Sequence, residues 1–340
     1  MRAADRLTVV IPSRGRPNYL FRSVKYWLSL GVRVTVCEEA PKPSQELTEM
    51  SKSIQRLDYR WLNASIAERL SQATSAIETE FCIWSSDDEF VLPSSLSLCM
   101  RTLDEQPWVG CSGRSLSFWV SGGRFHFSPV YTPTLLLADT NEVRIRECLS
   151  SYGEPLLWNL YRTDVLRRSA KLMRDHEFSI GAASELLHAV SIATIGAVGS
   201  IDAILRLRSG ENANQWAPVS ERLPTFRSWW DSEVSERETM LQALSGLTRE
   251  IDPAEQLTSE EIAACFQNYL DLHNPPNTGS ATSALLAKSR GLAARTLGSS
   301  INNLRFRRRE SKFIRAFSKD ERADLEEIRN LVEVFHGDSM

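Results

Sequence analysis

The chain has 340 residues, of which 42% are hydrophobic and 24% are charged. This composition is typical of an ordinary folded protein and excludes an intrinsically disordered chain. The formal net charge of −3 gives no overall attraction for nucleic acid, so charge has to be examined locally. The length admits one large domain, or a main domain with an appendage.

Six cysteines are scattered along the chain, without a Cys-x-x-Cys pair or a Cys/His spacing typical of zinc sites. Their mostly apolar neighbours predict buried free thiols in a reducing compartment. The N-terminus lacks the apolar core of a secretory signal, and no run of about 18 apolar residues occurs. These features predict a cytoplasmic protein.

The first elements predict a parallel sheet. Residues 7–12 form a short β-branched run that indicates a buried strand. Pro17 can begin a helix, which Gly31 ends, and residues 32–40 form a second strand closed by two glutamates. A strand, a helix and a strand in this order indicate a right-handed crossover between parallel strands.

The pattern repeats before residue 100. Residues 59–63 predict a short strand, and residues 65–78 predict an amphipathic helix that Ser65 and Glu68 begin with a capping box. Residues 80–86 are a further strand. This part therefore predicts the order β-α-β-loop-β-α-β, with acidic residues at the carboxyl ends of two strands, where open α/β sheets bind ligands.

Later elements are less regular. The composition over residues 107–137 predicts strands and a hairpin around Gly122 and Gly123. Further elements are a turn and helix over residues 143–173, an apolar helix over 184–198 that ends near Gly196, and a strand over 199–210. From residue 210 the chain is polar and helix-prone. We therefore expect an α/β domain over 1–209 and a mainly helical extension over 210–340.

Asp87, Asp88 and Glu89 follow the strand of residues 80–86 directly. Three adjacent carboxylates need a neutralising partner, and they offer the oxygen ligands that Mg²⁺ or Mn²⁺ prefers. If the backbone stays extended, residues 87 and 89 point to the same side and can hold one ion. The alternative is a solvated acidic turn.

This stretch resembles the metal-binding Asp-x-Asp motif of family 2-like glycosyltransferases with the GT-A fold. It is most similar to a bacterial subgroup with an Asp-Asp-Asp-Phe-(Ile/Val)-Leu-Pro sequence, which stands here as residues 87–93 with Glu89 in place of the last Asp. The family's Ile-Pro-(Ser/Thr)-x-x-Arg-Pro passage is matched at Pro12, Ser13 and Arg16. The resemblance covers roughly residues 7–208 and depends on the order of several short motifs.

The resemblance implies a GT-A, Rossmann-like fold with a mostly parallel central sheet flanked by helices. It implies a nucleotide site at Pro12, Ser13, Arg16, Asp87 and Asp88, and a metal site at Asp87, Asp88 and Glu89. Glu38 or Glu39 falls where the family places an acid against the nucleoside, and Arg69 falls near an arginine of its Asn-x-Gly…Ala-Arg-Asn passage. Asn63 fits the start of that passage, but its glycine and its final Asn are absent.

An inverting glycosyl transfer needs a carboxylate that takes the proton of the acceptor hydroxyl. Glu185 matches the family's acidic residue at the start of a helix, and Asp175 and Glu177 compete with it for this role. Alternatively, Glu185 only favours the positive end of its helix. We expect His188 to be a core or rim residue. We expect His176 to be a solvated loop residue. Trp158 and Tyr161 either stack on a sugar or pack in the core.

The segment Arg305–Arg315 mixes arginines with phenylalanines. It predicts a surface helix on an anionic membrane, a phosphate-backbone contact with nucleic acid, or a solvated face that pairs with the acidic last helix. The membrane alternative would place the protein peripherally at the inner face of the membrane, next to a lipid-linked acceptor.

Together with the acidic loop, the family resemblance implies a metal-dependent, inverting glycosyltransferase that uses Mn²⁺ or Mg²⁺. It would move a sugar from a nucleotide-sugar donor to a hydroxyl of a glycan or lipid-linked acceptor, and the resemblance implies surface polysaccharide biosynthesis. Residues 1–209 would bind the donor and catalyse, while residues 210–340 would contact the acceptor, a membrane surface or another subunit. The alternatives are a sugar nucleotidyltransferase and a nucleic-acid- or partner-binding protein on an inactive transferase scaffold.

Overall fold

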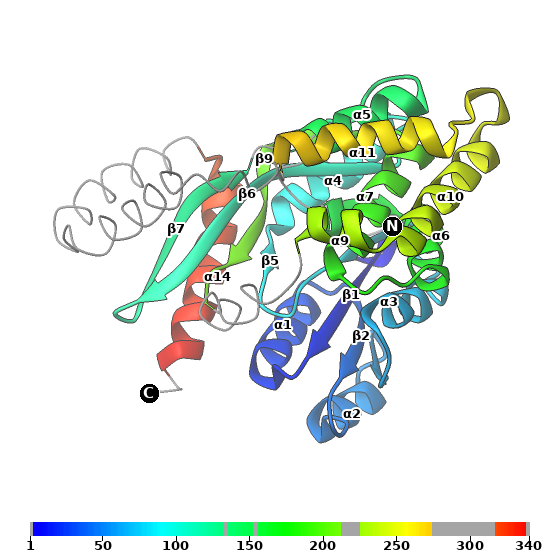
Figure 1. The fold of residues 1–340 in the computed structure, drawn as a ribbon. Coiled ribbons are helices and arrows are strands. Elements are labelled where there is room, and N and C mark those ends of the chain that lie inside the picture. Colours follow the sequence, from blue (N-terminus) through cyan, green and yellow to red (C-terminus); the bar gives the residue numbers. More distant parts are fainter. Residues whose placement is uncertain are drawn as a thin grey trace, which may run out of the picture.

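The computed structural model describes residues 3–131, 133, 135–151, 156–211, 225–273 and 317–337. Within these ranges nine strands form one sheet, in the order β3-β2-β1-β4-β8-β6-β9-β5, with β7 paired to β6 (Figure 1). The strands are β1 (Leu7–Arg14), β2 (Arg33–Glu39), β3 (Leu57–Trp61), β4 (Phe81–Trp84), β5 (Phe90–Val91), β6 (Gly110–Ser121), β7 (Arg124–Tyr131), β8 (Leu160–Arg162) and β9 (Val198–Ser209).

The sheet is mostly parallel, as predicted. Strands β1 to β4 are mutually parallel, and β6 and β9 run in the same direction beyond the intervening antiparallel β8. The short β5 and the hairpin strand β7 are antiparallel to their neighbours. The carboxyl ends of β1, β2, β3 and β4 therefore lie along one edge of the sheet.

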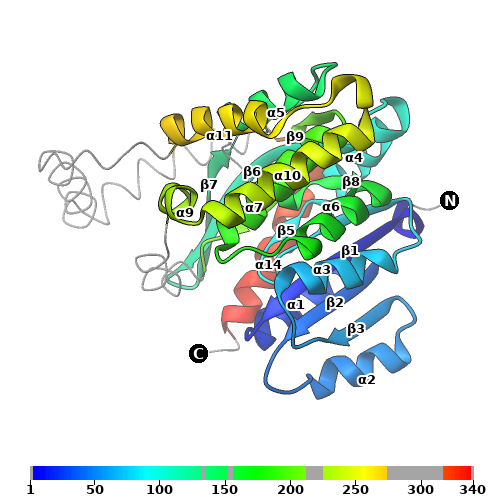
Figure 2. The ribbon, with the colours of Figure 1, turned by 45° about the vertical axis from the view of Figure 1, so that its right-hand side comes forward.

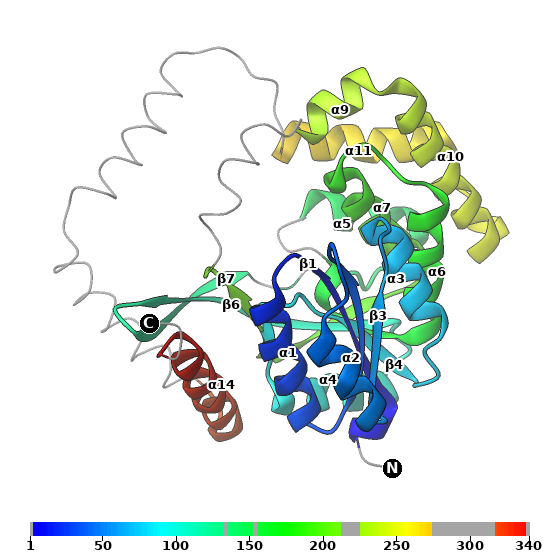
Figure 3. The ribbon, with the colours of Figure 1, turned by 90° about the horizontal axis from the view of Figure 1, so that it is seen from below.

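Helices cover both faces of the sheet (Figures 2 and 3). One apolar cluster joins the sheet to α3 (Ile66–Ser75), α5 (Asn141–Ser150), α6 (Thr163–Asp175), α7 (Gly181–Ile195), α9 (Phe226–Ser232), α10 (Val234–Ile251) and α11 (Ser259–His273). The other joins it to α1 (Pro17–Ser29), α2 (Gln45–Ser53), α4 (Pro93–Glu105) and α14 (Lys319–Gly337).

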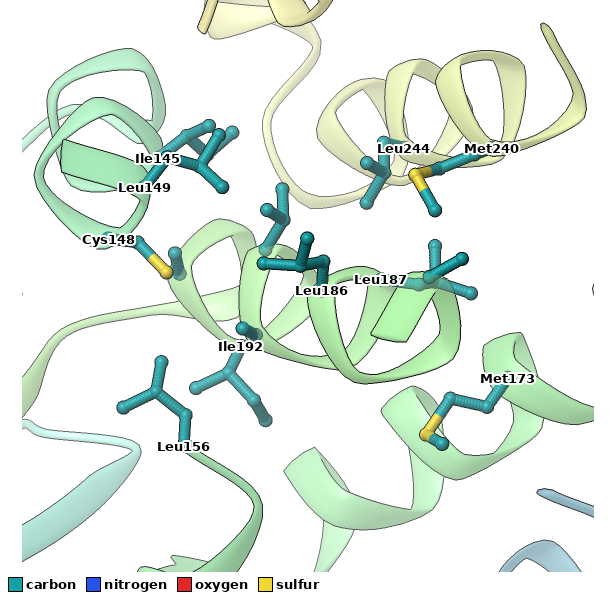
Figure 4. Close-up of a cluster of buried hydrophobic side chains, with 14 of the residues drawn as sticks. Ile145, Cys148, Leu149, Leu156, Met173, Leu186, Leu187, Ile192, Met240 and Leu244 are labelled. Carbon is teal, nitrogen blue, oxygen red and sulfur yellow. The ribbon is translucent and has the colours of Figure 1, made fainter. Parts of the chain in front are cut away.

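The C-terminal helices share the core of the sheet domain. Figure 4 shows Leu186 and Leu187 of α7 facing Met240 and Leu244 of α10, with α5 on the other side. In Figure 1, α14 runs alongside β7. The expectation of a helical C-terminal part is confirmed, whereas the boundary at residue 209 stays a prediction. Among the described helices, none has both the length and the apolar character that crossing a membrane requires.

Most predicted elements of the first 210 residues are confirmed. Ser65 caps α3 by accepting a hydrogen bond from the Glu68 backbone N–H, at 3.1 Å. Gly122 and Gly123 form the turn between β6 and β7 with φ values of 58° and 69°, a region that favours glycine. Helix α7 ends at Ile195, directly before Gly196. All six cysteines are buried free thiols, as expected.

Some elements differ from the prediction. The expected loop after β2 contains α2, and the expected turn before α6 contains the antiparallel strand β8. Strand β8 has only three residues, too few to show an alternating pattern. The segment Arg305–Arg315 lies outside the described residues.

Candidate functional site

The acidic loop after β4 lies beside the carboxyl end of β1. The Ser85 backbone N–H donates to the Val10 carbonyl at 2.9 Å, which holds the start of the loop against β1. Asp87 is 0% exposed and Asp88 is 7% exposed. A solvated acidic turn would leave these carboxylates in water, so that alternative is wrong for both.

Arg16, at the start of α1, neutralises the two aspartates together. Its Nη1 donates to Asp88 Oδ2 at 2.7 Å, and its Nη2 forms an ion pair with Asp87 Oδ1. Ser13 Oγ donates to Asp87 Oδ2 at 2.6 Å, and Ser86 Oγ donates to Asp88 Oδ1 at 2.6 Å. The structure therefore brings the predicted residues Ser13, Arg16, Asp87 and Asp88 into contact, with Pro12 buried in β1 just before Ser13.

Burial raises the pKa of Asp87 from 3.8 to about 6, although the Arg16 charge and the Ser13 hydrogen bond act in the opposite direction. The cost of removing the carboxylate from water is thus only partly offset by its partners. A further cation at this site would lower the pKa again.

Glu89 lies apart from the Arg16 pair. Residues 87 and 88 form a turn, so the backbone is not extended there and the expected alternation of residues 87 and 89 is wrong. The Glu89 carboxylate approaches Arg206 of β9, with Nε and Oε2 3.7 Å apart. In the part of the chain that the structure describes, no group of three or more His, Cys, Asp or Glu side chains is arranged to hold a metal ion.

Glu38 and Glu39 have different environments at the end of β2. Glu38 is 2% exposed and accepts a hydrogen bond of 2.7 Å from the Tyr59 hydroxyl, which itself accepts one from the Ser44 backbone N–H at the start of α2. Glu39 has a side chain that is 24% exposed and pairs with Arg14 and Arg69, each at 3.3 Å. Glu39 is therefore the accessible carboxylate, and Glu38 supports the backbone.

Arg69 links the ends of two strands. It is buried in α3, and its Nη1 donates to the carbonyl oxygens of Ser13 at 2.8 Å and Cys37 at 2.9 Å. Burial lowers the pKa of Arg69. Arg69 lies beside Glu39, and its contacts with the two carbonyl oxygens fix the edge of the sheet. Asn63 is exposed at the same edge.

Glu185 is half-buried on α7, in the fifth position of the helix. The first turn of α7 contains no acidic residue, so Glu185 lies beyond the turn where a carboxylate gains most from the helix dipole. One turn further along, the ring of His188 lies 4.9 Å from that of Trp84, the last residue of β4. This contact places the first turns of α7 beside the strand that precedes Asp87.

The competing acids differ in their surroundings. Asp175 pairs at 2.7 Å with both Lys171 and Arg174, and hydrogen bonds from these two residues lower its pKa. Glu177 accepts a hydrogen bond from Ser65 Oγ, at the N-terminus of α3 and hence at the carboxyl edge of the sheet. His176 is half-buried between them, at the end of α6.

His188 and Tyr161 are core residues. The His188 ring is buried, its Nδ1 lies 2.8 Å from Ser169 Oγ, and burial lowers its pKa to about 3. The Tyr161 hydroxyl donates to the Leu156 carbonyl at 2.6 Å, and its buried ring is inaccessible to a sugar. Trp158 is half-buried and packs against the same apolar cluster.

Two arginines near the acidic loop were not predicted from the sequence. Arg206 contacts Glu89 from β9, and Arg22 of α1 approaches the Asp88 carbonyl oxygen at 3.5 Å. Both are buried, and each meets the loop from a distant part of the chain. No local motif marks such contacts.

Comparison with solved structures shows the fold. Neither a family model nor a curated protein sequence matches the chain. The structure of residues 1–349 of S. aureus TarS, a glycosyltransferase, is similar to this chain with a TM-score of 0.53 and 13% identity, over 80% of this chain and 73% of that one. TarS 1–349 in complex with UDP is similar with a TM-score of 0.50 and 13% identity, over 82% and 75%. The likeness confirms the expected fold class.

Proposed function

We propose that the protein is a metal-dependent glycosyltransferase that uses a nucleotide-sugar donor. The observation that carries this proposal is the buried contact of Arg16 with Asp87 and Asp88, at the carboxyl edge of a sheet with a glycosyltransferase-like fold. A TarS structure of similar fold contains UDP, which supports a nucleotide as the ligand. The motif order of the family 2-like subgroup points to the same function.

The donor would lie across the ends of β4, β1 and β2. Glu39 and Arg69 would contact the nucleoside, and the guanidinium of Arg16 would donate to diphosphate oxygens, which it suits by its planar, bidentate geometry. Pro12 and Ser13 would line the space between them, and Glu38 would hold the end of β2 from behind. In this arrangement Arg16 exchanges its aspartate partners for the diphosphate.

The oxygen donors of the acidic loop fit Mg²⁺ or Mn²⁺, because Mg²⁺ commonly takes one or two carboxylates together with substrate phosphates. Asp87 and Asp88 would hold the ion, with Glu89 joining if it leaves Arg206. When bound, the ion supplies charge compensation for the departing diphosphate. The pKa of Asp87 is raised although Arg16 lies beside it, which supports a site that binds a further cation.

Glu185 would accept the proton of the acceptor hydroxyl while its oxygen bonds to the anomeric carbon and the bond to the nucleoside diphosphate breaks on the opposite face. Such a single displacement inverts the anomeric configuration, as the family resemblance implies. Glu177 is the second choice, because its contact with Ser65 places it at the same sheet edge. Asp175 is a weaker base, because its two cationic partners stabilise its ionised form. The acceptor would be a glycan or lipid-linked saccharide in surface polysaccharide biosynthesis. All these donor and base residues lie within 1–209.

A thermal-shift screen of nucleoside diphosphates and nucleotide sugars, each with and without Mn²⁺, tests the proposal. We expect Mn²⁺-dependent stabilisation, because a ligand at a hundred times its Kd adds about 2.7 kcal/mol. The shift should vanish in Asp88→Ala and persist in Asp202→Ala, whose exposed side chain lies on the surface. Equal shifts in Asp88→Ala and the wild type would refute the metal site.

The same screen separates the alternatives. A nucleic-acid-binding protein would instead show salt-sensitive binding of an oligonucleotide and no response to nucleotide sugars. A sugar nucleotidyltransferase would respond to a nucleoside triphosphate together with a sugar phosphate. Hydrolysis or transfer of the donor that stabilises best, measured by release of the nucleoside diphosphate, then tests the reaction.

A further inference from the structure

A buried ion pair lies directly behind the acidic loop. Arg22 of α1 donates from Nη1 and Nη2 to the two carboxylate oxygens of Glu211, at 2.9 and 2.7 Å. The side chains are 3% and 1% exposed. Glu211 follows β9 by two residues, so this pair joins α1 to the end of a strand almost 190 residues away in sequence.

Arg22 also contacts the acidic loop itself. Its Nη2 lies 3.5 Å from the Asp88 carbonyl oxygen, and its guanidinium carbon lies 5.1 Å from the centre of the Phe90 ring, just after Glu89. The position of Arg22 therefore influences the main chain on both sides of Glu89. A guanidinium removed from water also needs all its partners in place, because its desolvation is costly.

The last turn of α14 completes the surroundings of this pair. The Phe335 ring lies 4.5 Å from the guanidinium carbon of Arg22, a shorter distance than that of Tyr19 or Phe90. His336 Nε2 contacts the Oε1 atom of Glu211. Two consecutive residues of the C-terminal helix thus touch the two members of the ion pair.

Helix α14 is fixed to the sheet domain along its length. Carboxylates of Glu321, Asp324 and Glu333 accept hydrogen bonds from the backbone N–H groups of Ile204, Ser94 and Phe125, at 2.8, 2.8 and 3.0 Å. These three contacts span more than three turns of the helix and involve three different elements of the domain. The last turn is therefore held in place beside Arg22.

We infer that Phe335 and His336 are positioning residues for the donor site. By excluding water from the Arg22–Glu211 pair and contacting both members, they hold Arg22 against the Asp88 carbonyl and Phe90, and so set the conformation of the acidic loop. This inference rests on the proposed function for its consequence, since a misplaced loop binds nucleotide and metal less well. It assigns the end of α14 to the donor site.

Phe335→Ala is the main test, and Val334→Ala is its matched control. Val334 is the preceding residue on the same helix and is 62% exposed, so its truncation removes no contact with Arg22. The first readout is hydrogen exchange of the backbone amides of residues 85–91, which reports the acidic loop without any ligand. We expect these amides to exchange about tenfold faster in Phe335→Ala, as the loss of a desolvated cation–π contact implies, and at the wild-type rate in Val334→Ala.

The second readout is the Kd for UDP with Mn²⁺, measured by calorimetry on the same full-length proteins. Phe335→Ala should weaken binding about tenfold, and His336→Gln, which keeps a hydrogen-bond donor to Glu211, should bind within about twofold of the wild type. A destabilised helix would instead speed exchange along the whole of α14, including residues 320–330, and leave residues 85–91 unchanged. That result would overturn the inference, as would equal exchange of the loop in all variants.

The two readouts separate this inference from the proposed function. If the wild type binds no nucleotide but Phe335→Ala still loosens residues 85–91 selectively, the positioning role holds and the proposed donor site fails. If the wild type binds UDP with Mn²⁺ and Phe335→Ala changes neither readout, the donor site stands and the role of α14 fails.

Discussion

The ionisation of Asp87 affects the stability of the metal-free protein. Its folded-state pKa of about 6 lies above the ordinary value of 3.8, so the folded protein binds the proton more tightly than the unfolded chain does. The free energy of unfolding therefore falls as the pH rises from about 4 to above 6, by about 3 kcal/mol from this group alone. A carboxylate with a depressed pKa would show the opposite sign.

Urea unfolding with a chelator present, at pH 4.5 and pH 7.5, measures this effect. We expect Asp87→Asn to gain stability relative to the wild type between the two pH values, because the amide has no charge to bury. Arg16 keeps Asp88 as its partner in this variant. If the difference between the two proteins stays constant with pH, Asp87 does not titrate as described.

The proposed role of Glu185 as the base can be tested separately from donor binding. Replacing Glu185 with Gln keeps its size but removes its basicity, so turnover should fall about 10²- to 10⁴-fold while the Kd of the donor nucleotide stays near that of the wild type. Glu177→Gln is the parallel variant. If Glu177→Gln loses turnover while Glu185→Gln keeps it, Glu177 is the base.

Among the elements, α2 is an example of a helix that could not be predicted from the sequence. Only Leu47 of this helix is buried, and Met50, one turn further on, is only partly buried, so its apolar pattern is too short to distinguish the helix from a loop. Its signal is the N-cap, where Ser44 Oγ accepts a hydrogen bond from the Leu47 backbone N–H at 3.3 Å. The amphipathic α3 and the buried strands, by contrast, follow from their patterns because each buries a regular row of side chains.

The cap of α2 can be tested directly. Ser44→Ala should cost about 1 kcal/mol of the free energy of unfolding, because the N-terminal N–H groups lose their acceptor. Ser51→Ala, in the last turn of the same helix, should be neutral or slightly stabilising, because alanine has the higher helix propensity. Chemical denaturation measures the free energy of unfolding of both variants. If both lose the same stability, the loss comes from replacing a serine in this helix and not from removing its N-cap.

In the candidate site, too, some contacts can be predicted from the sequence and others cannot. The order of Pro12, Ser13, Arg16, Asp87 and Asp88 along the chain predicts their meeting, because parallel strands bring their carboxyl ends to one edge. The choice between Glu38 and Glu39 could not be made, since neighbouring residues on a strand face opposite ways and the sequence does not say which face is buried. The Arg22–Glu211 pair could not be predicted from the sequence, because only the tertiary fold brings its two members together.

At the scale of the whole molecule, the donor residues and the helices that cover them come from different parts of the chain. Every residue that we propose to contact the donor or the metal ion precedes residue 210, yet α10 and α11 cover α5 and α7, and α14 covers α4 and β7. Without them, Leu186 and Leu187 would lose the cover of α10 on one side of the sheet, and Phe125 and Phe127 would lose the cover of α14 on the other. Residues 1–209 therefore depend on the C-terminal helices for part of their core.

A fragment that ends at residue 209 makes this dependence measurable. We expect it to unfold without cooperativity or to aggregate, because it exposes both apolar faces and loses Glu211, the partner of the buried Arg22. Leu244→Ala in the full chain is the milder version and should cost about 2–5 kcal/mol, since this side chain is fully buried against α7. A fragment with a sharp thermal transition and UDP binding like the full chain would show that residues 1–209 are an independent domain, and that α14 has no part in the donor site.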